Sequence, residues 1–209
     1  MSNKSRSRRA VLGAIGAVAL LGVTPAARAT TDRIDTSFDP SSESAIRSFA
    51  TNFRTLAPER RRTVFESLTT EQRTATKRAF APERIEFDQN VSPQRTAQDT
   101  NVVRTARAKG WSLLGFHLWT WNHRASWSHE EDSVYDVQSS DFATVHDPTW
   151  AYKGTAAHSK DVDGDHFEVF RQGKLTFLGG RYTLSASPYA RIRGNADGSS
   201  TVLAVDDGY

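Results

Sequence analysis

Histidine is the first residue type in this chain whose number and spacing could do chemistry. All six histidines fall between His117 and His166, and His117, His123 and His129 are six residues apart. An unbroken strand would place those three on one side but about 20 Å from one to the next, whereas zinc ligands lie about 2 Å from one point. The spacing therefore favours separate surface or hydrogen-bonded histidines over a metal site.

Acidic residues supply the second candidate chemistry. The run from Asp161 to Asp165 has aspartate at alternate positions, as at the start of a calcium-binding EF-hand loop. That loop needs Gly at its sixth position and Glu at its twelfth, where this chain has His166 and Gln172. Two hypotheses remain: a weak calcium site formed by Asp161, Asp163 and Asp165, or a solvated turn. We expect no bound cofactor.

The sequence does not favour catalysis. The chain has no cysteine, which excludes thiolate nucleophiles, disulfides and cysteine zinc sites. It also lacks a G-x-S-x-G nucleophile elbow and a glycine-rich phosphate loop. The neighbouring carboxylates Glu130, Glu131 and Asp132 fall in an expected exposed turn, where nothing holds them across a substrate. We therefore expect a protein without enzymatic activity.

Aromatic residues gather in the stretch 111–127, which holds four of the five tryptophans. We interpret its first half, through about Leu118, as a buried central strand because both of its faces are apolar. The second half mixes tryptophan with polar residues as it leads into a turn. Aromatic rings there either fill the core or bind a ligand such as a sugar. The candidate binding residues are Trp119, Trp121, His123, Arg124 and Trp127.

Residues 101–209, which contain all of these candidates, are predicted to form an antiparallel β-sandwich. Short segments of β-branched and aromatic residues, such as 167–171 and 189–193, alternate with turn signals such as 195–198. Many short strands with turns at intervals of about 8–12 residues are typical of that architecture.

Residues 39–84 form the expected helical region. Apolar residues recur there at three- and four-residue spacing, which makes one apolar helical face. Leu56, Leu68 and Phe80 stand 12 residues apart, and each is followed by a cap residue, a Pro or Thr, and an early Glu. This repeat closes one helix and opens the next. It predicts short helices in a hairpin or bundle.

Residues 85–100 separate the two regions. They lose apolar periodicity and gain Gln, Asn, Asp and Pro, which is typical of a linker or an extended arm. The chain as a whole is therefore predicted to be of the α+β class, with a short N-terminal helical hairpin or bundle followed by an antiparallel β-sandwich.

Residues 1–29 have the composition of an export signal. Basic residues precede an apolar run at 10–23, and an Ala-x-Ala site predicts cleavage after Ala29. The run is shorter than the roughly 20 residues of a membrane span, so we expect no permanent anchor, with an uncleaved anchor as the alternative.

The core of this segment, Ser7-Arg8-Arg9-Ala10-Val11-Leu12, resembles the twin-arginine export signal. The resemblance implies that Arg8 and Arg9 engage the twin-arginine translocase, which carries folded proteins. It also implies that the mature protein is secreted.

Removal of the leader changes the charge balance. Five of the 27 Lys and Arg residues lie in 1–29, which leaves 22 basic residues against 24 Asp and Glu, a net charge of about −2. The basic character of the whole chain thus belongs to the leader, and we expect no binding to nucleic acid.

The β-rich part carries a second resemblance. A tryptophan-rich strand is followed by WAYKG at 150–154, FRQGKL at 170–175, PY at 188–189 and DG at 197–198. This succession is similar to a group of uncharacterised secreted β-rich proteins of halophilic archaea and filamentous bacteria. Members of that group often carry a cysteine pair around the segment that corresponds to FRQGKL at 170–175. This chain lacks that pair. The resemblance implies a secreted β-rich fold and no established activity.

Together these features predict a secreted, non-enzymatic binding or interaction protein. Its ligand would be a cell-surface glycan or a protein, bound near residues 119–127. The alternative is a secreted antimicrobial or toxin precursor, whose helical region would be a pro-region released by proteolysis in the linker.

Overall fold

The computed structural model describes residues 34–95, 101–130, 132–180 and 182–206, all within one compact unit, Arg33–Tyr209. The predicted export signal, including Arg8, Arg9 and the cleavage site at Ala29, lies outside the described residues. Among the residues that are described, no helix has the length and the apolar character that crossing a membrane requires.

Three helices lie in the region that was predicted to be helical: α1 (Glu43–Thr55), α2 (Pro58–Ser67) and α3 (Thr70–Phe80). The Ser42 side chain caps α1 by accepting a hydrogen bond from the Ala45 N–H. Thr69 and Gln72 form a reciprocal capping box at the start of α3. The 12-residue repeat thus marks the helix boundaries.

Phenylalanines pack the helices onto one another and onto a strand. Phe53 of α1 contacts Phe65 of α2 and Phe80 of α3, with ring centroids 6.4 and 6.0 Å apart. Phe65 and Phe80 in turn contact Phe177 at 5.7 and 5.6 Å. The helices therefore share one core with the β-rich part.

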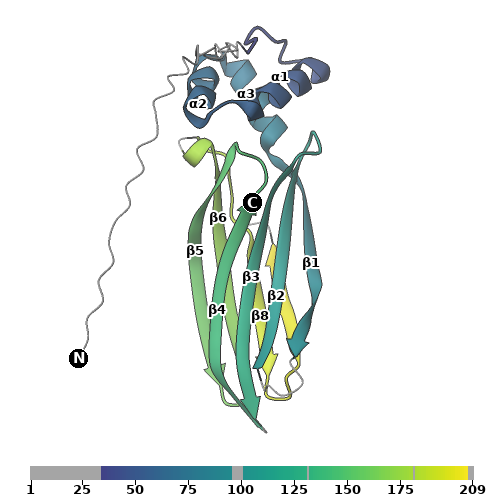
Figure 1. Ribbon diagram of the computed structural model, residues 1–209, viewed down its shortest axis with the longest axis vertical. Helices are drawn as coiled ribbons and strands as arrows, with labels where there is room; N and C mark the ends of the chain where they lie inside the picture. Colours follow the sequence, from purple (N-terminus) through teal and green to yellow (C-terminus); the bar gives the residue numbers. More distant parts are fainter. Residues whose placement is uncertain (1–33, 96–100, 131, 181, 207–209) are drawn as a thin grey trace, which may run out of the picture. The chain divides into compact units, whose positions relative to one another are not determined.

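The described residues that follow α3 form two antiparallel sheets (Figure 1). In the first sheet the strand order is β1-β2-β3-β4, and in the second it is β5-β6-β8-β9, with β7 paired to β6. The strands are β1 (Pro82–Arg95), β2 (Asn101–Ser112), β3 (His117–Glu130), β4 (Ser133–Val145), β5 (Trp150–Asp163), β6 (His166–Phe177), β7 (Ser185–Ala186), β8 (Tyr189–Asn195) and β9 (Ser200–Asp206), and a short 3-10 helix, η1, spans Leu178–Gly180.

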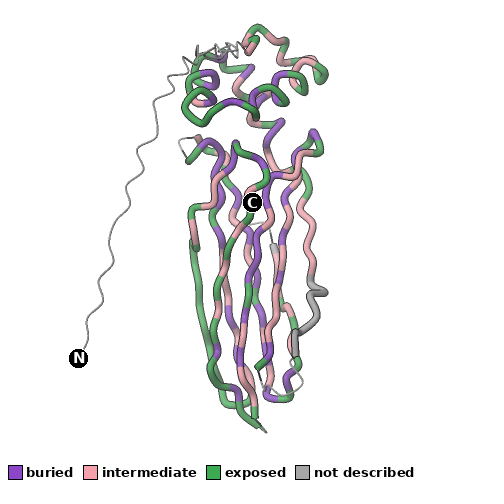
Figure 2. Tube along the Cα trace, in the orientation of Figure 1, coloured by how far each residue is buried: buried purple, intermediate pink, exposed green. Residues whose placement is uncertain are grey.

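Tryptophans of β3 pack against the second sheet at two glycines. A Cβ atom at Gly173 of β6 would overlap the Trp121 indole, and one at Gly194 of β8 would overlap Phe167. Trp127 meets the Phe167 ring edge-on, with centroids 5.1 Å apart. Buried residues accordingly run along β3 (Figure 2).

The tryptophan-rich stretch is a hairpin, which corrects the prediction that residues 111–118 form one central strand. Strand β2 ends at Ser112, and the backbone turns through Gly115, whose φ of 80° is unfavourable for other residues. Leu118 is then an extra residue in β3, because Trp111 pairs with His117 whereas Gly110 pairs with Trp119. This bulge puts His117 on the opposite face from Trp119.

The segment predicted to be a linker, residues 85–100, contains most of β1. Strand β1 pairs with β2 from Pro82 to Arg95, with register shifts along its length. Its polar composition suits an edge strand with one hydrogen-bonded side, which is why the composition resembled that of a linker. Residues 96–100 lie outside the described part. Residues 85–95 are therefore part of a paired strand. The precursor hypothesis had assumed that they form a cleavable linker.

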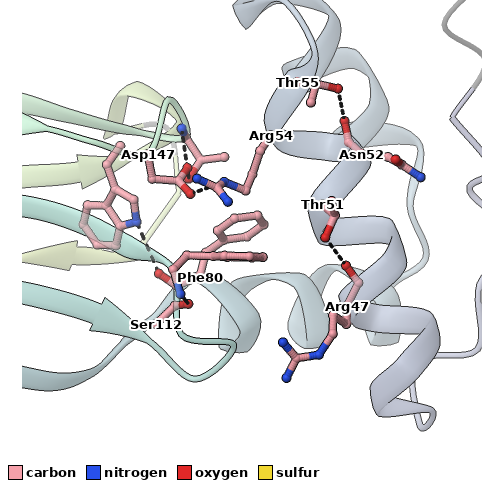
Figure 3. A network of polar contacts seen from close by, with 11 residues as sticks. Arg47, Thr51, Asn52, Arg54, Thr55, Phe80, Ser112 and Asp147 are labelled. Atoms are coloured by element: carbon pink, nitrogen blue, oxygen red, sulfur yellow. Dashed lines mark hydrogen bonds and ion pairs between the residues drawn. The ribbon is translucent and has the colours of Figure 1, made fainter.

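A polar contact joins α1 to the loop between β4 and β5 (Figure 3). Arg54 Nε lies 2.6 Å from Asp147 Oδ2, and the Asp147 side chain is fully buried. Asp147 Oδ1 accepts hydrogen bonds from the Thr149 N–H and hydroxyl at 2.9 and 2.6 Å. The Arg54 guanidinium also lies over the Phe116 ring, 4.2 Å from its centroid.

Candidate functional site

Four of the five candidate binding residues are buried, which favours the first of the two interpretations of the aromatic rings, that they fill the core. Trp119 and His123 are 0% exposed, and Trp121 and Trp127 are 1% exposed. The alternation of β3 turns all four towards the second sheet, where glycines make room for the indoles. These rings form core, so they cannot stack on an external ligand.

Trp121 belongs to a buried polar cluster around Asp141 of β4. The Trp121 indole N–H donates to Asp141 Oδ2 at 3.1 Å, and the Tyr152 hydroxyl donates to the same oxygen. Arg171 of β6 lies 3.8 Å from Asp141 Oδ1, and Thr155 donates to that oxygen. The carboxylate is thus held by donors from three other strands, which joins the two sheets.

His123 lies beside this cluster as a neutral imidazole. Its Nε2 atom is 3.1 Å from the Ser139 hydroxyl, which accepts a hydrogen bond from Arg171 Nε at 3.0 Å. The hydroxyl proton is therefore free to point at His123. Burial, with a smaller contribution from the charge of Arg171, lowers the pKa of His123 to about 4. His123 is fully buried, so this contact fixes the imidazole in the interior, while Ser139 itself also lines the pocket described below.

The other histidines do not converge into a metal site. His117 stacks on His146 with ring centroids 3.9 Å apart, and both Nε2 atoms lie 3.1 Å from the Thr120 hydroxyl. Burial and then the neighbouring His146 lower the pKa of His117. In the described part of the chain, no three His, Asp or Glu side chains are grouped so that they could hold a metal ion.

The same finding bears on the calcium hypothesis. Asp161 and Asp163 are exposed near the end of β5, and Asp165 lies in the turn before β6. Asp165 bonds to His166 Nδ1 at 2.7 Å, which lowers the pKa of Asp165. The three aspartates form no cation cage. This run is therefore a solvated hairpin turn, closed by the pair Asp163 and His166.

Arg124 is the one candidate that faces solvent, and it lines a polar pocket on the first sheet. The pocket has a volume of about 280 Å³. It lies on the face of β3 and β4 opposite the buried tryptophans, because Arg124 alternates with His123 and Ala125 along β3. We call it the Arg124 pocket, and it is lined by Arg124, Ser126, Gln138, Ser139 and Ser140.

Strand register brings these residues together. Arg124 pairs with Ser140, and Ser126 pairs with Gln138 on the neighbouring strand. Opposite positions of an antiparallel pair lie about 5 Å apart, so the four side chains form a compact grid of donors and acceptors. None of the four makes a hydrogen bond or ion pair with another described side chain. They are therefore available to a ligand.

An exposed aromatic ring lies next to this grid. Phe142 is 49% exposed and lies two residues from Ser140, so both are on the same face of β4. Its cross-strand partner Asn122 accepts a hydrogen bond from Arg107 at 3.0 Å. Gln138, Ser140 and Phe142 could not be found by sequence reasoning, because only the register of β3 and β4 places them beside Arg124.

Comparison with protein-family models, curated proteins and solved structures found no match to this chain. What the Arg124 pocket can bind is therefore inferred from its own side chains. Its groups can donate and accept several neighbouring hydrogen bonds, and the adjacent ring can stack on an apolar surface. The pocket lining contains no acid and no histidine. This set can recognise a polar ligand through hydrogen bonds.

Proposed function

We propose that this protein is a secreted, non-enzymatic binding protein and that the Arg124 pocket binds a saccharide of a cell-surface glycan. The observation that carries the proposal is the grid of four unpaired polar side chains beside the exposed ring of Phe142. Each hydroxyl of a sugar is both a hydrogen-bond donor and an acceptor. Guanidinium, amide and hydroxyl groups spaced about 5 Å apart can bond them in pairs.

Arg124 and Phe142 have separate roles in this proposal. The guanidinium presents parallel N–H donors to two adjacent sugar oxygens. The exposed ring stacks on the C–H face of a sugar, where burial of apolar surface adds affinity. A ligand with an acidic sugar would gain further from the positive charge of Arg124.

The proposal also includes the finer architecture and the route of export. We propose that the two sheets form an antiparallel β-sandwich carrying a three-helix bundle, supported by the facing contacts of Trp121 with Gly173 and Trp127 with Phe167. The twin-arginine translocase would be the partner during export, supported by the paired Arg8 and Arg9. Outside the cell, a rigid sheet face is a suitable platform for a glycan.

Binding to a panel of immobilised glycans, followed by isothermal titration calorimetry with the best soluble oligosaccharide, tests the proposal. We expect Arg124→Ala and Gln138→Ala each to weaken binding about tenfold, because each removes one or two charge-assisted or neutral hydrogen bonds. Lys174→Ala is the matched control, since Lys174 is an exposed cation on β6 of the other sheet.

Two results would contradict the proposal. One is a wild-type protein that binds no glycan of the panel. The other is glycan binding that Arg124→Ala and Lys174→Ala leave equally strong.

A further inference from the structure

A second pocket lies between helix α2 and the beginning of the second sheet, and its lining is basic. It has a volume of about 280 Å³. Arg61 and Arg62 of α2 and Lys153 of β5 line it, together with Thr149, and none of its described lining residues is acidic. We call it the α2 pocket. Its surplus of positive charge is the feature that needs an explanation.

Arg61 is the most unusual residue of the α2 pocket. It is only 4% exposed, and its Nε and Nη1 atoms are buried without a hydrogen-bond partner in the described part of the chain. Burial lowers the pKa of its guanidinium, and the charge of Asp147 partly offsets that effect. A buried ionised group without a partner is strongly unfavourable, so such groups are normally paired. An anion bound next to Arg61 would therefore stabilise the folded protein.

Asp147 does not meet that need. Its Oδ1 atom already accepts two hydrogen bonds from Thr149, and its Oδ2 atom pairs with Arg54 at 2.6 Å (Figure 3). One carboxylate thus faces two guanidinium groups, and its single negative charge can offset only one of the two positive charges. The charge of Asp147 reaches Arg61 only through space.

The two other cations of the α2 pocket are also open to a ligand. Arg62 pairs with Glu59 at 3.1 Å, but Glu59 is a highly exposed residue, and a solvated pair of this kind is weak. Lys153 is exposed on β5. A small anion in the pocket would therefore meet one buried and two solvated cations.

We propose that the α2 pocket binds a small tetrahedral oxyanion, namely a phosphate group, with Arg61 as its buried anchor. A phosphate group presents several acceptor oxygens to a guanidinium at the wall of the pocket, whereas a chloride ion presents a single point of charge. Lys153 and Arg62 supply further charge from the open side. This site is separate from the Arg124 pocket and does not depend on glycan binding.

Thermal unfolding in sodium phosphate, against sodium chloride of matched ionic strength, tests the proposal. We expect about 10 mM phosphate to raise the melting temperature of the wild type by several degrees, because a ligand that binds only the folded state stabilises it. Arg61→Gln should abolish the shift and Lys153→Gln should reduce it. Arg60→Gln is the matched control, since Arg60 is the exposed neighbour on the same helix.

A second variant separates a ligand anchor from a structural residue. Arg61→Met removes the unpaired charge and keeps most of the volume, so without phosphate its melting temperature should equal or exceed that of the wild type. If Arg61→Met melts markedly lower and the wild type does not respond to phosphate, Arg61 is a structural partner of Asp147 and the proposal fails. It also fails if Arg60→Gln loses the phosphate shift as fully as Arg61→Gln.

Titration with inorganic phosphate and with glycerol 3-phosphate distinguishes the source of the group. Tighter binding of the ester would identify a phosphorylated organic ligand. Equal or weaker binding of the ester would identify free phosphate, and either result supports a phosphate site. Binding of neither, up to about 10 mM, would overturn it.

Discussion

Successive residues of β3 lie alternately in the core and at the surface, and composition alone cannot tell which residue is in which place. His123 and Arg124 are neighbours, yet one is fully buried beside Ser139 and the other faces solvent in the Arg124 pocket. Both are polar residues in a tryptophan-rich stretch, so their types gave no reason to assign them to different faces. Only the alternation of the strand, fixed by the bulge at Leu118, decides which one can reach a ligand.

Burial of His123 predicts a stability that falls in acid. The pKa of His123 is about 4 in the folded protein, below its value of 6.5 in an unfolded chain. Between these values the unfolded chain binds a proton that the folded protein does not, so the free energy of unfolding falls as the pH drops from about 6.5 to 4. The expected loss is about 3 kcal/mol for a shift of this size.

Urea unfolding of the wild type and of His123→Gln at pH 7 and pH 4.5 measures this effect. The variant should lose less stability than the wild type over that interval, because it lacks the titrating ring. His158→Gln, at an exposed position on β5, is the control and should behave as the wild type. Equal losses in His123→Gln and the wild type would refute the assignment of a neutral buried imidazole.

Elements whose signals are local could be predicted from the sequence, and elements that depend on distant partners could not. The caps at Ser42 and Thr69 lie within four residues of the helices they start, so the helical region was predictable. Strand β1 became visible only through its pairing with β2, and its polar side chains resembled a linker. The burial of Trp121 likewise depends on Gly173, which lies far along the chain on β6.

The close approach of β6 to β3 predicts that Gly173 tolerates no side chain. A methyl group there would overlap the Trp121 indole, whose N–H is committed to Asp141, so the ring cannot move away without losing that bond. Gly173→Ala should lower the free energy of unfolding by about 1–3 kcal/mol, as overpacked cores do.

Denaturant unfolding followed by tryptophan fluorescence measures the loss. Lys174→Ala, at the next position and exposed, should change the free energy of unfolding by less than about 0.5 kcal/mol. A Gly173→Ala protein as stable as the wild type would mean that the two sheets do not pack at this point.

At the scale of the whole molecule, the helices and the sheets behave as one folded body. Phe65 and Phe80 pack on Phe177, the Trp150 indole N–H donates to the Phe80 carbonyl at 3.2 Å, and Arg54 pairs with Asp147. Such a body suits export in the folded state, and it gives the helical region a structural role that a removable pro-region would not have.

The resemblance of the leader to a twin-arginine signal predicts that export depends on both arginines. Replacement of Arg8 and Arg9 by Lys should abolish appearance of the protein in the culture medium, whereas Arg6→Lys, in the same basic segment, should leave it unchanged. Immunoblotting of medium and cells measures both. Undiminished export of the double variant would indicate a route other than the twin-arginine translocase.

Mass spectrometry of the secreted protein tests the integrity of the chain in the same cultures. We expect a species that begins at Thr30 and is not cut within residues 85–95, because β1 is paired with β2 through Arg95. A major fragment that begins between residues 85 and 101 would instead support the precursor hypothesis.

The Arg124 pocket is the central claim, and an NMR titration of the ¹⁵N-labelled protein with its best soluble oligosaccharide tests it most directly. The side-chain signals of Arg124 and Gln138 and the backbone amides of Ser126 and Ser140 should shift, while the indole N–H signals of the buried Trp121 and Trp127 should not. Shifts confined to the second sheet, or none at a sugar concentration of about ten times the dissociation constant, would contradict the assignment of this pocket.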